Sequence, residues 1–126
     1  MQQKVLIIED SASTISLLTK LVEMAQLKPV LATSLTAAKH IFIHSDPEDY
    51  LCAIVDYDLP DAPNGEAIDF AVKSYLPTIV TTARLDEDIR KAVLARDVVD
   101  YIPKENAQIF DYLMRLIGRL EKNKTT

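Results

Sequence analysis

Five short apolar segments alternate along the chain with segments of helical periodicity, and this alternation constrains the fold more than any other feature. The first segment has apolar side chains on both faces, which is typical of a parallel strand covered by helices on both sides. Strands that alternate with helices form one parallel sheet, so a doubly wound α/β domain is predicted. The predicted strands are residues 5–8, 29–32, 51–55, 78–81 and 98–102.

Helices are predicted after each strand because apolar residues recur there three or four positions apart. Ser11 or Ser13 is expected to cap the first helix, and Ser34 is expected to cap the second. The helices are expected to cover residues 15–25, 35–42, 67–75, 86–95 and 107–120.

The length of 126 residues suits one domain and is too short for two. Residues 1–122 are expected to form this domain. Residues 121–126 are polar and are expected to fray, and 123–126 form a tail that could link to a further domain.

Composition excludes several classes of protein. A net charge of −5 provides no basic face for nucleic acid. No apolar run approaches the ~20 residues of a membrane helix, and the start of the chain does not resemble a signal peptide. The single cysteine, Cys52, lies in an apolar strand and is expected to be a core residue. A reducing, cytoplasmic setting is therefore expected, without nucleic-acid or membrane partners.

Polar residues follow four of the five predicted strands at their C-terminal ends. Taken singly, each has an ordinary reading as a cap, a loop residue or a surface charge. Because these strand ends meet at one edge of a parallel sheet, the set is expected to converge on one crevice. Its members are Glu9 and Asp10 after the first strand, Asp56 and Asp58 after the third, Thr82 after the fourth and Lys104 after the fifth.

This combination of groups suits phosphoryl transfer. Several carboxylates placed together repel one another, so a divalent cation is needed to keep them ionised. Oxygen ligands with open positions suit magnesium, which retains water and accepts phosphate oxygens. An aspartate such as Asp56 can act as a nucleophile and form an acyl phosphate. A lysine such as Lys104 supplies a compact positive charge for the phosphoryl group.

The motifs resemble the response-regulator receiver domains of two-component signalling, in the CheY-like superfamily. The resemblance covers residues 4 to about 120. It rests on Glu9-Asp10, Asp56-Tyr-Asp-Leu-Pro60, Thr82-Ala83 and Asp100-Tyr-Ile-Pro-Lys104. It implies a flavodoxin-like fold in which one strand–helix unit is repeated five times.

The resemblance also implies a phosphorylation-dependent signalling switch. Asp56 would accept a phosphoryl group from a sensor histidine kinase or a phosphotransfer protein in a phosphorelay. Glu9, Asp10, Asp56 and the backbone carbonyl of Asp58 would hold Mg²⁺, or Mn²⁺ in its place. No turnover of an external substrate is expected, so the chain would not be a conventional enzyme.

Three further residues would read the phosphorylated state. Thr82 would bond a phosphoryl oxygen, and Lys104 would pair first with the carboxylate and then with the phosphoryl group. Tyr101 would change orientation on activation. The fourth strand, fourth helix and fifth strand would form the two-state element. A homodimer or an adjacent domain would use the fourth helix, the fifth strand and the last helix.

The sequence departs from the family pattern near Lys104 and in one loop. Glu105 follows Lys104, where a proline is usual, and Asp97-Val98 replaces the usual Gly-Ala. The loop from Pro60 to Gly65 is one residue longer than is common. These departures predict an atypical output face. The loop and the segment around Lys104 also look similar to receivers placed ahead of a second receiver and a cyclic-dinucleotide-making (GGDEF) domain.

The last predicted helix has an unusually wide apolar arc. Phe110, Tyr112 and Met114 widen the stripe that would face the core. The arc predicts either a helix buried at its edges or a contact surface for a partner, a second copy or an adjacent domain.

Two other functions stay open from the sequence. One is an interaction module that keeps the receiver fold and works without phosphorylation. The other is a phosphatase of the haloacid-dehalogenase type, because Asp56-Tyr57-Asp58 has the Asp-x-Asp form used there. In that type the motif usually follows the first strand, and Thr or Val comes two residues later. Here it follows the third strand, and Pro60 occupies that place.

Overall fold

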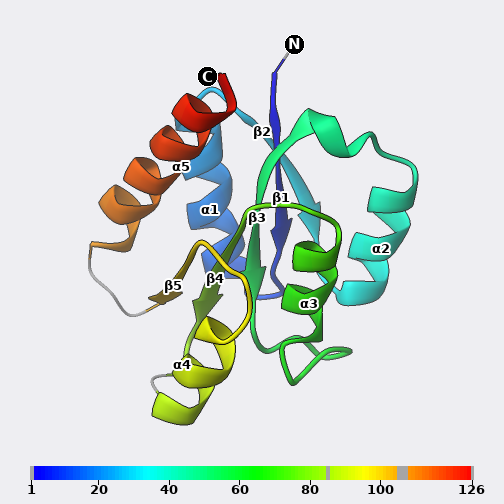
Figure 1. Ribbon diagram of the computed structural model, residues 1–126, viewed down its shortest axis with the longest axis vertical. Coiled ribbons are helices and arrows are strands. Elements are labelled where there is room, and N and C mark those ends of the chain that lie inside the picture. Colours follow the sequence, from blue (N-terminus) through cyan, green and yellow to red (C-terminus); the bar gives the residue numbers. More distant parts are fainter. Residues whose placement is uncertain (1, 85, 105–107, 126) are drawn as a thin grey trace.

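The computed structural model describes residues 2–84, 86–104 and 108–125, which form one parallel five-stranded sheet between two layers of helices (Figure 1). The strands are β1 (Lys4–Ile8), β2 (Lys28–Ala32), β3 (Tyr50–Asp56), β4 (Thr78–Thr82) and β5 (Asp100–Pro103). The helices are α1 (Ala12–Met24), α2 (Leu35–Ile43), α3 (Glu66–Lys73), α4 (Glu87–Leu94) and α5 (Ile109–Thr125), with a short 3-10 helix η1 (Pro47–Asp49). The strand order β2-β1-β3-β4-β5 confirms the predicted doubly wound fold.

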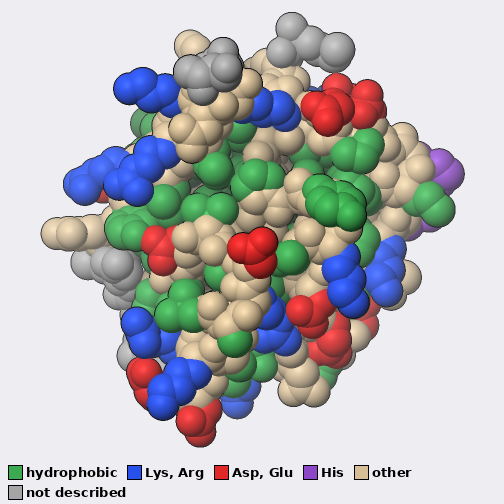
Figure 2. All heavy atoms as spheres, viewed as in Figure 1, with side chains coloured by type: hydrophobic (Ala, Val, Ile, Leu, Met, Phe, Trp, Pro, Cys, Tyr) green, Lys and Arg blue, Asp and Glu red, His purple; other side chains and the backbone are tan. Residues whose placement is uncertain are grey.

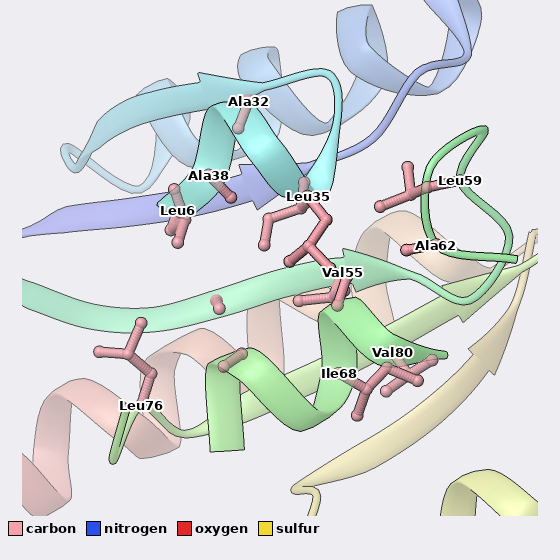
Figure 3. Close-up of a cluster of buried hydrophobic side chains, with 14 of the residues drawn as sticks. Leu6, Ala32, Leu35, Ala38, Val55, Leu59, Ala62, Ile68, Leu76 and Val80 are labelled. Carbon is pink, nitrogen blue, oxygen red and sulfur yellow. The ribbon is translucent and has the colours of Figure 1, made fainter. Parts of the chain in front are cut away.

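β3 lies at the centre of the sheet, paired with β1 on one side and β4 on the other, and all its residues are buried. From Cys52 to Val55 its side chains alternate between two apolar clusters. Val55 packs with residues of α2, α3 and α4 (Figure 3), whereas Ile54 packs with residues of α1 and α5. Cys52 belongs to the second cluster, which confirms the predicted core position. Burial there raises the pKa of its thiol to about 12.

The predicted fraying of the last residues is wrong for the described part, because α5 runs through Thr125. Lys124 explains the extension. Its ammonium group donates to the carbonyl oxygens of Glu48 at 3.0 Å and Tyr50 at 2.9 Å, so the last turn is attached to the start of β3. The predicted start of this helix at residue 107 lies outside the described residues.

The apolar arc of α5 is used mainly inside the domain. Phe110 and Met114 are half-buried and pack against the same cluster as the central stripe. Tyr112 is 39% exposed, and its hydroxyl group donates to the carboxylate of Asp100. The edges of the arc are therefore packed against the core at Phe110 and Met114 and exposed at Tyr112. Neither α5 nor any other helix in the described residues is long and apolar enough to cross a membrane.

Apolar side chains also gather on the surface shown in Figure 2, with charged side chains around them. A groove of about 700 Å³ is lined by Leu51, Leu76, Pro77 and Leu120 among others. Leu51 stands near the start of β3, so this groove lies away from the edge where the strands end.

Of three local predictions at helix and strand starts, one is confirmed, one is confirmed in position only and one is wrong. The hydroxyl group of Ser34 accepts from the Ala37 N–H at 3.0 Å, as expected for a cap. Ser11 is the N-cap residue of α1, but its side chain makes no capping hydrogen bond, and Ser13 lies inside the helix. β5 begins at Asp100, two residues later than predicted, because the preceding chain is still turning out of α4.

α3 ends at Lys73, so the prediction that it reaches Tyr75 is wrong. Tyr75 has a φ of 63° and a side chain that is 94% exposed. Its N–H donates to the Val72 carbonyl at 3.0 Å, and the Leu76 N–H donates to the Ala71 carbonyl at 3.2 Å. This pair of bonds closes a helix through a left-handed residue, which is usually glycine.

Tyr75→Gly is therefore expected to stabilise the protein by about 0.5–1 kcal/mol, because glycine adopts the left-handed backbone without strain. Urea unfolding measures the change. Lys73→Gly is the matched control in regular helix and should destabilise by about 1 kcal/mol. Destabilisation by both substitutions would show that the backbone at Tyr75 is not strained.

Candidate functional site

The structure brings the predicted acids together at the C-terminal edge of the sheet. Glu9 and Asp10 follow β1 directly, and Asp56 is the last residue of β3. Carboxylate oxygens of these three residues all lie within 4.8 Å of one another. Glu9 and Asp56 are buried, whereas Asp10 is exposed to solvent. The cluster is thus open on the side of Asp10 and closed toward the core.

Lys104 brings a positive charge to the two buried acids. Its ammonium group donates to Asp56 Oδ2 at 3.2 Å and to Glu9 Oε1. Burial by itself would lower the pKa of Lys104, but the hydrogen bond to Glu9 and the charge of Asp56 outweigh it and raise that pKa. The Lys104 N–H also donates to the Thr82 carbonyl at 2.7 Å, which attaches the end of β5 to β4.

Glu9 shows that one lysine does not balance the charge of the clustered acids. Its Oε2 atom is buried and has no hydrogen-bond partner among the described residues. Burial, together with the hydrogen bond to Asp56, raises the pKa of Glu9 from 4.5 to about 7. An ionised carboxylate is costly to bury without a partner, and a metal ion provides one. The cluster of Glu9, Asp10 and Asp56 can hold a metal ion, and its oxygen ligands suit a hard divalent cation.

The remaining predicted residues lie around this cluster. The Asp58 N–H donates to Asp56 Oδ1 at 3.3 Å, so both Asp56 oxygens have partners. Thr82 is fully buried at the end of β4. Tyr101 is half-buried, and its hydroxyl group donates to the Arg84 carbonyl at 2.9 Å. The Tyr101 hydroxyl group thus bonds the loop between β4 and α4 rather than the carboxylates.

Arg84 is a site residue that sequence reasoning missed. Its N–H donates to Thr82 Oγ1 at 3.1 Å, and its guanidinium group pairs with Asp58 Oδ1 at 3.5 Å. With the Tyr101 bond, Arg84 contacts three of the predicted residues. Its position two residues after Thr82 was the available signal, but an isolated arginine in a loop reads as an ordinary surface charge.

The predicted departures from the family pattern have different outcomes. Glu105 lies outside the described residues. The longer loop ends at Gly65, where a φ of +79° requires a left-handed backbone. A Cβ atom at Gly65 would also lie 2.8 Å from the Tyr57 ring. Glycine is therefore required at this position by both conformation and space.

The chain is similar to solved structures, although no family model and no curated protein matches it. The chain is 34% identical to a solved structure described as a two-component system response regulator/GGDEF domain protein, with a TM-score of 0.81. That match covers 97% of this chain and 49% of the other, so this chain spans about half of that relative.

Two single receiver domains are similar over nearly their whole length. A response regulator receiver domain protein from Clostridium thermocellum has 18% identity, a TM-score of 0.81 and coverage of 98% of this chain and 97% of that one. The BeF3-activated DrrB receiver domain has 13% identity, a TM-score of 0.79 and coverage of 97% and 99%. The sheet order, the acidic edge and these likenesses together identify the chain as a receiver domain of the CheY-like response-regulator type.

Proposed function

We propose that this receiver domain is a phosphorylation-dependent switch whose Asp56 accepts a phosphoryl group from a histidine kinase or a phosphotransfer protein. The observation that carries the proposal is the half-buried Lys104 ammonium group, which bonds both Asp56 and Glu9 beside a carboxylate cluster. The likeness to a receiver described as BeF3-activated also supports it.

The resident cation would be Mg²⁺, held by Glu9, Asp10, Asp56 and the backbone carbonyl of Asp58. It would supply positive charge against the carboxylates and the phosphoryl oxygens. The chain's own groups orient the nucleophile, because the Asp58 N–H and the Lys104 ammonium group fix the two Asp56 oxygens. The hydrogen bond and charge of Lys104 favour the ionised form of Glu9.

The transfer forms a bond between an Asp56 carboxylate oxygen and phosphorus, while the phosphorus–nitrogen bond of a phosphohistidine donor breaks. The bonding electron pair leaves with the imidazole nitrogen, which takes a proton from solvent. Lys104 is placed to remain beside the added group, since it already contacts Asp56. The haloacid-dehalogenase alternative would need the Asp58 carboxylate as an acid–base group, but that carboxylate pairs with Arg84.

A phosphoryl group carries about 1.5 to 2 negative charges, where the Asp56 carboxylate carried one. Thr82 and Tyr101 both bond the backbone of Arg84, through its N–H and its carbonyl oxygen. If the Thr82 hydroxyl turns toward a phosphoryl oxygen, it gives up the Arg84 N–H, and the loop that holds Tyr101 is released. The switch would then extend from β4 through α4 to β5.

Incubation with Mg²⁺ and acetyl phosphate tests the proposal, because intact mass spectrometry detects the acyl phosphate. Wild type should gain one phosphoryl group, and Asp56→Asn or wild type with the metal chelated should gain none. Thermal unfolding of Asp56→Asn checks that the variant is folded. No adduct on wild type would favour the module that works without phosphorylation.

We also propose that this receiver controls an output of the GGDEF type. The relative with 34% identity is described with a GGDEF domain. The sequence around the Pro60 loop also looked similar to receivers of that kind. We therefore place this receiver in the control of cyclic-dinucleotide synthesis, rather than in direct binding of nucleic acid.

A further inference from the structure

The loop between β3 and α3 is attached to a distant helix through Asp61. The Asp61 carboxylate accepts from the Leu35 N–H at 3.0 Å, the Thr36 N–H at 2.9 Å and the Thr36 hydroxyl group at 2.9 Å. Leu35 and Thr36 form the start of α2, about 26 residues earlier in the chain. Hydrogen bonds from the backbone of Thr36 and then of Leu35 hold the pKa of Asp61 below its usual value, so the carboxylate is ionised at neutral pH.

α2 already has a cap from its own chain. Ser34 precedes it and accepts from the Ala37 N–H at 3.0 Å. Asp61 therefore adds a carboxylate as a second acceptor, for two other N–H groups of the same helix end. The second attachment fixes the loop as well as the helix, because Asp61 belongs to the loop.

The segment from Asp58 to Ala62 connects the attachment at Asp61 with the acidic cluster. Leu59 and Ala62 bond each other through both backbone pairs, with N–O distances of 3.2 and 3.1 Å. Both side chains are buried, and Figure 3 shows them facing the apolar cluster that contains Leu35. Asp58 directly precedes this closed turn. Its N–H bonds Asp56, so its backbone lies against the acidic cluster.

The other end of the loop has a separate attachment. Arg96 donates to the Asn64 carbonyl at 3.2 Å and pairs with Asp69 at 2.8 Å. That attachment lies six residues beyond Asp58, whereas Asp61 lies three residues beyond it. Of these two attachments, Asp61 is the one closer to the Asp58 backbone beside the acidic cluster.

We propose that Asp61 is a positioning residue for the metal site, because its bonds to α2 hold the Asp58 backbone carbonyl where it completes the oxygen ligands of Glu9, Asp10 and Asp56. The inference rests on the proposed function, in which this cluster holds Mg²⁺. Coupling between two sites is reciprocal. Mg²⁺ should therefore strengthen the bonds between Asp61 and α2, just as these bonds strengthen Mg²⁺ binding.

Asp61→Asn and Ser34→Ala separate positioning from helix capping. Asp61→Asn should weaken Mg²⁺ binding roughly tenfold in calorimetric titration, as loss of a group that orients a ligand does. Ser34→Ala removes a cap from the same helix but not the link to the loop, and should change the affinity by less than about twofold. Equal weakening by both, or no weakening by Asp61→Asn, would overturn the inference. Failure of wild type to bind Mg²⁺ would instead contradict the proposed function.

Amide hydrogen exchange on wild type tests the reciprocal effect without any variant. Saturating Mg²⁺ should slow exchange at Leu35 and Thr36, whose N–H groups bond Asp61. Ala37, whose N–H bonds Ser34, should exchange at an unchanged rate and serves as the internal control. Unchanged exchange at Leu35 and Thr36, with Mg²⁺ bound, would overturn the inference.

Discussion

Without a bound cation, the protein should lose roughly 3 kcal/mol of unfolding free energy as the pH rises from 4.5 to about 7, through Glu9 alone. The folded protein binds the Glu9 proton more tightly than the unfolded chain does, because the carboxyl group is buried beside Asp56. The stabilisation is therefore complete below the unfolded pKa and is lost as the pH rises through the folded pKa. Urea unfolding at a series of pH values without Mg²⁺ measures it.

Glu9→Gln is the control for this slope, because an amide does not titrate. The difference between wild type and Glu9→Gln cancels the contributions of all other groups that titrate in the range. The variant should be the more stable protein above the folded pKa of Glu9, yet it should lose Mg²⁺ affinity. Saturating Mg²⁺ should also flatten the slope of wild type, since the cation favours the ionised carboxylate. Parallel slopes for the two proteins would exclude Glu9 as the source.

Lys104→Met should destabilise the metal-free protein by about 3 kcal/mol, because it leaves two buried acids without their cation. The side chains of Lys104, Glu9 and Asp56 are only 16%, 1% and 6% exposed, so water compensates little. Urea unfolding above the pKa of Glu9 measures the loss. Mg²⁺ should restore part of it, because the metal supplies the missing positive charge.

The control is an ion pair on the surface. Arg90 pairs with Glu87 at 3.2 Å, and both side chains are more than half exposed. Arg90→Met should therefore cost less than about 0.5 kcal/mol, with no response to Mg²⁺. Similar losses for the two variants would mean that burial of the acids is not what makes Lys104 important.

The fold and the acidic edge could be predicted because both follow from local patterns. Apolar periodicity indicates which faces of each strand and helix are buried, and parallel connection rules then place the strand ends at one edge. The acids at the ends of β1 and β3 are consequently brought together whatever the conformation of the loops. The position of Asp56 could be predicted from the buried strand that precedes it.

The loop contacts could not be predicted in the same way. Arg84 and Asp61 act through partners about 26 residues away in the chain, and no spacing rule relates them. Tyr75 adopts a backbone that its residue type disfavours, so propensity assigned it to α3. The last turn of α5 depends on the bonds of Lys124 to Glu48 and Tyr50, whereas its own composition suggested fraying.

Chemical labelling of Cys52 can report when the central strand, β3, leaves the sheet. It is the single cysteine of the sequence, and with a pKa of about 12 its thiol is almost entirely protonated at neutral pH. The thiolate is the form that attacks alkylating reagents, so this sulfur is modified only when β3 leaves its place between β1 and β4. The rate of labelling therefore measures how often the sheet opens. A short pulse of reagent counts the open molecules in any of the unfolding experiments above, without an engineered probe.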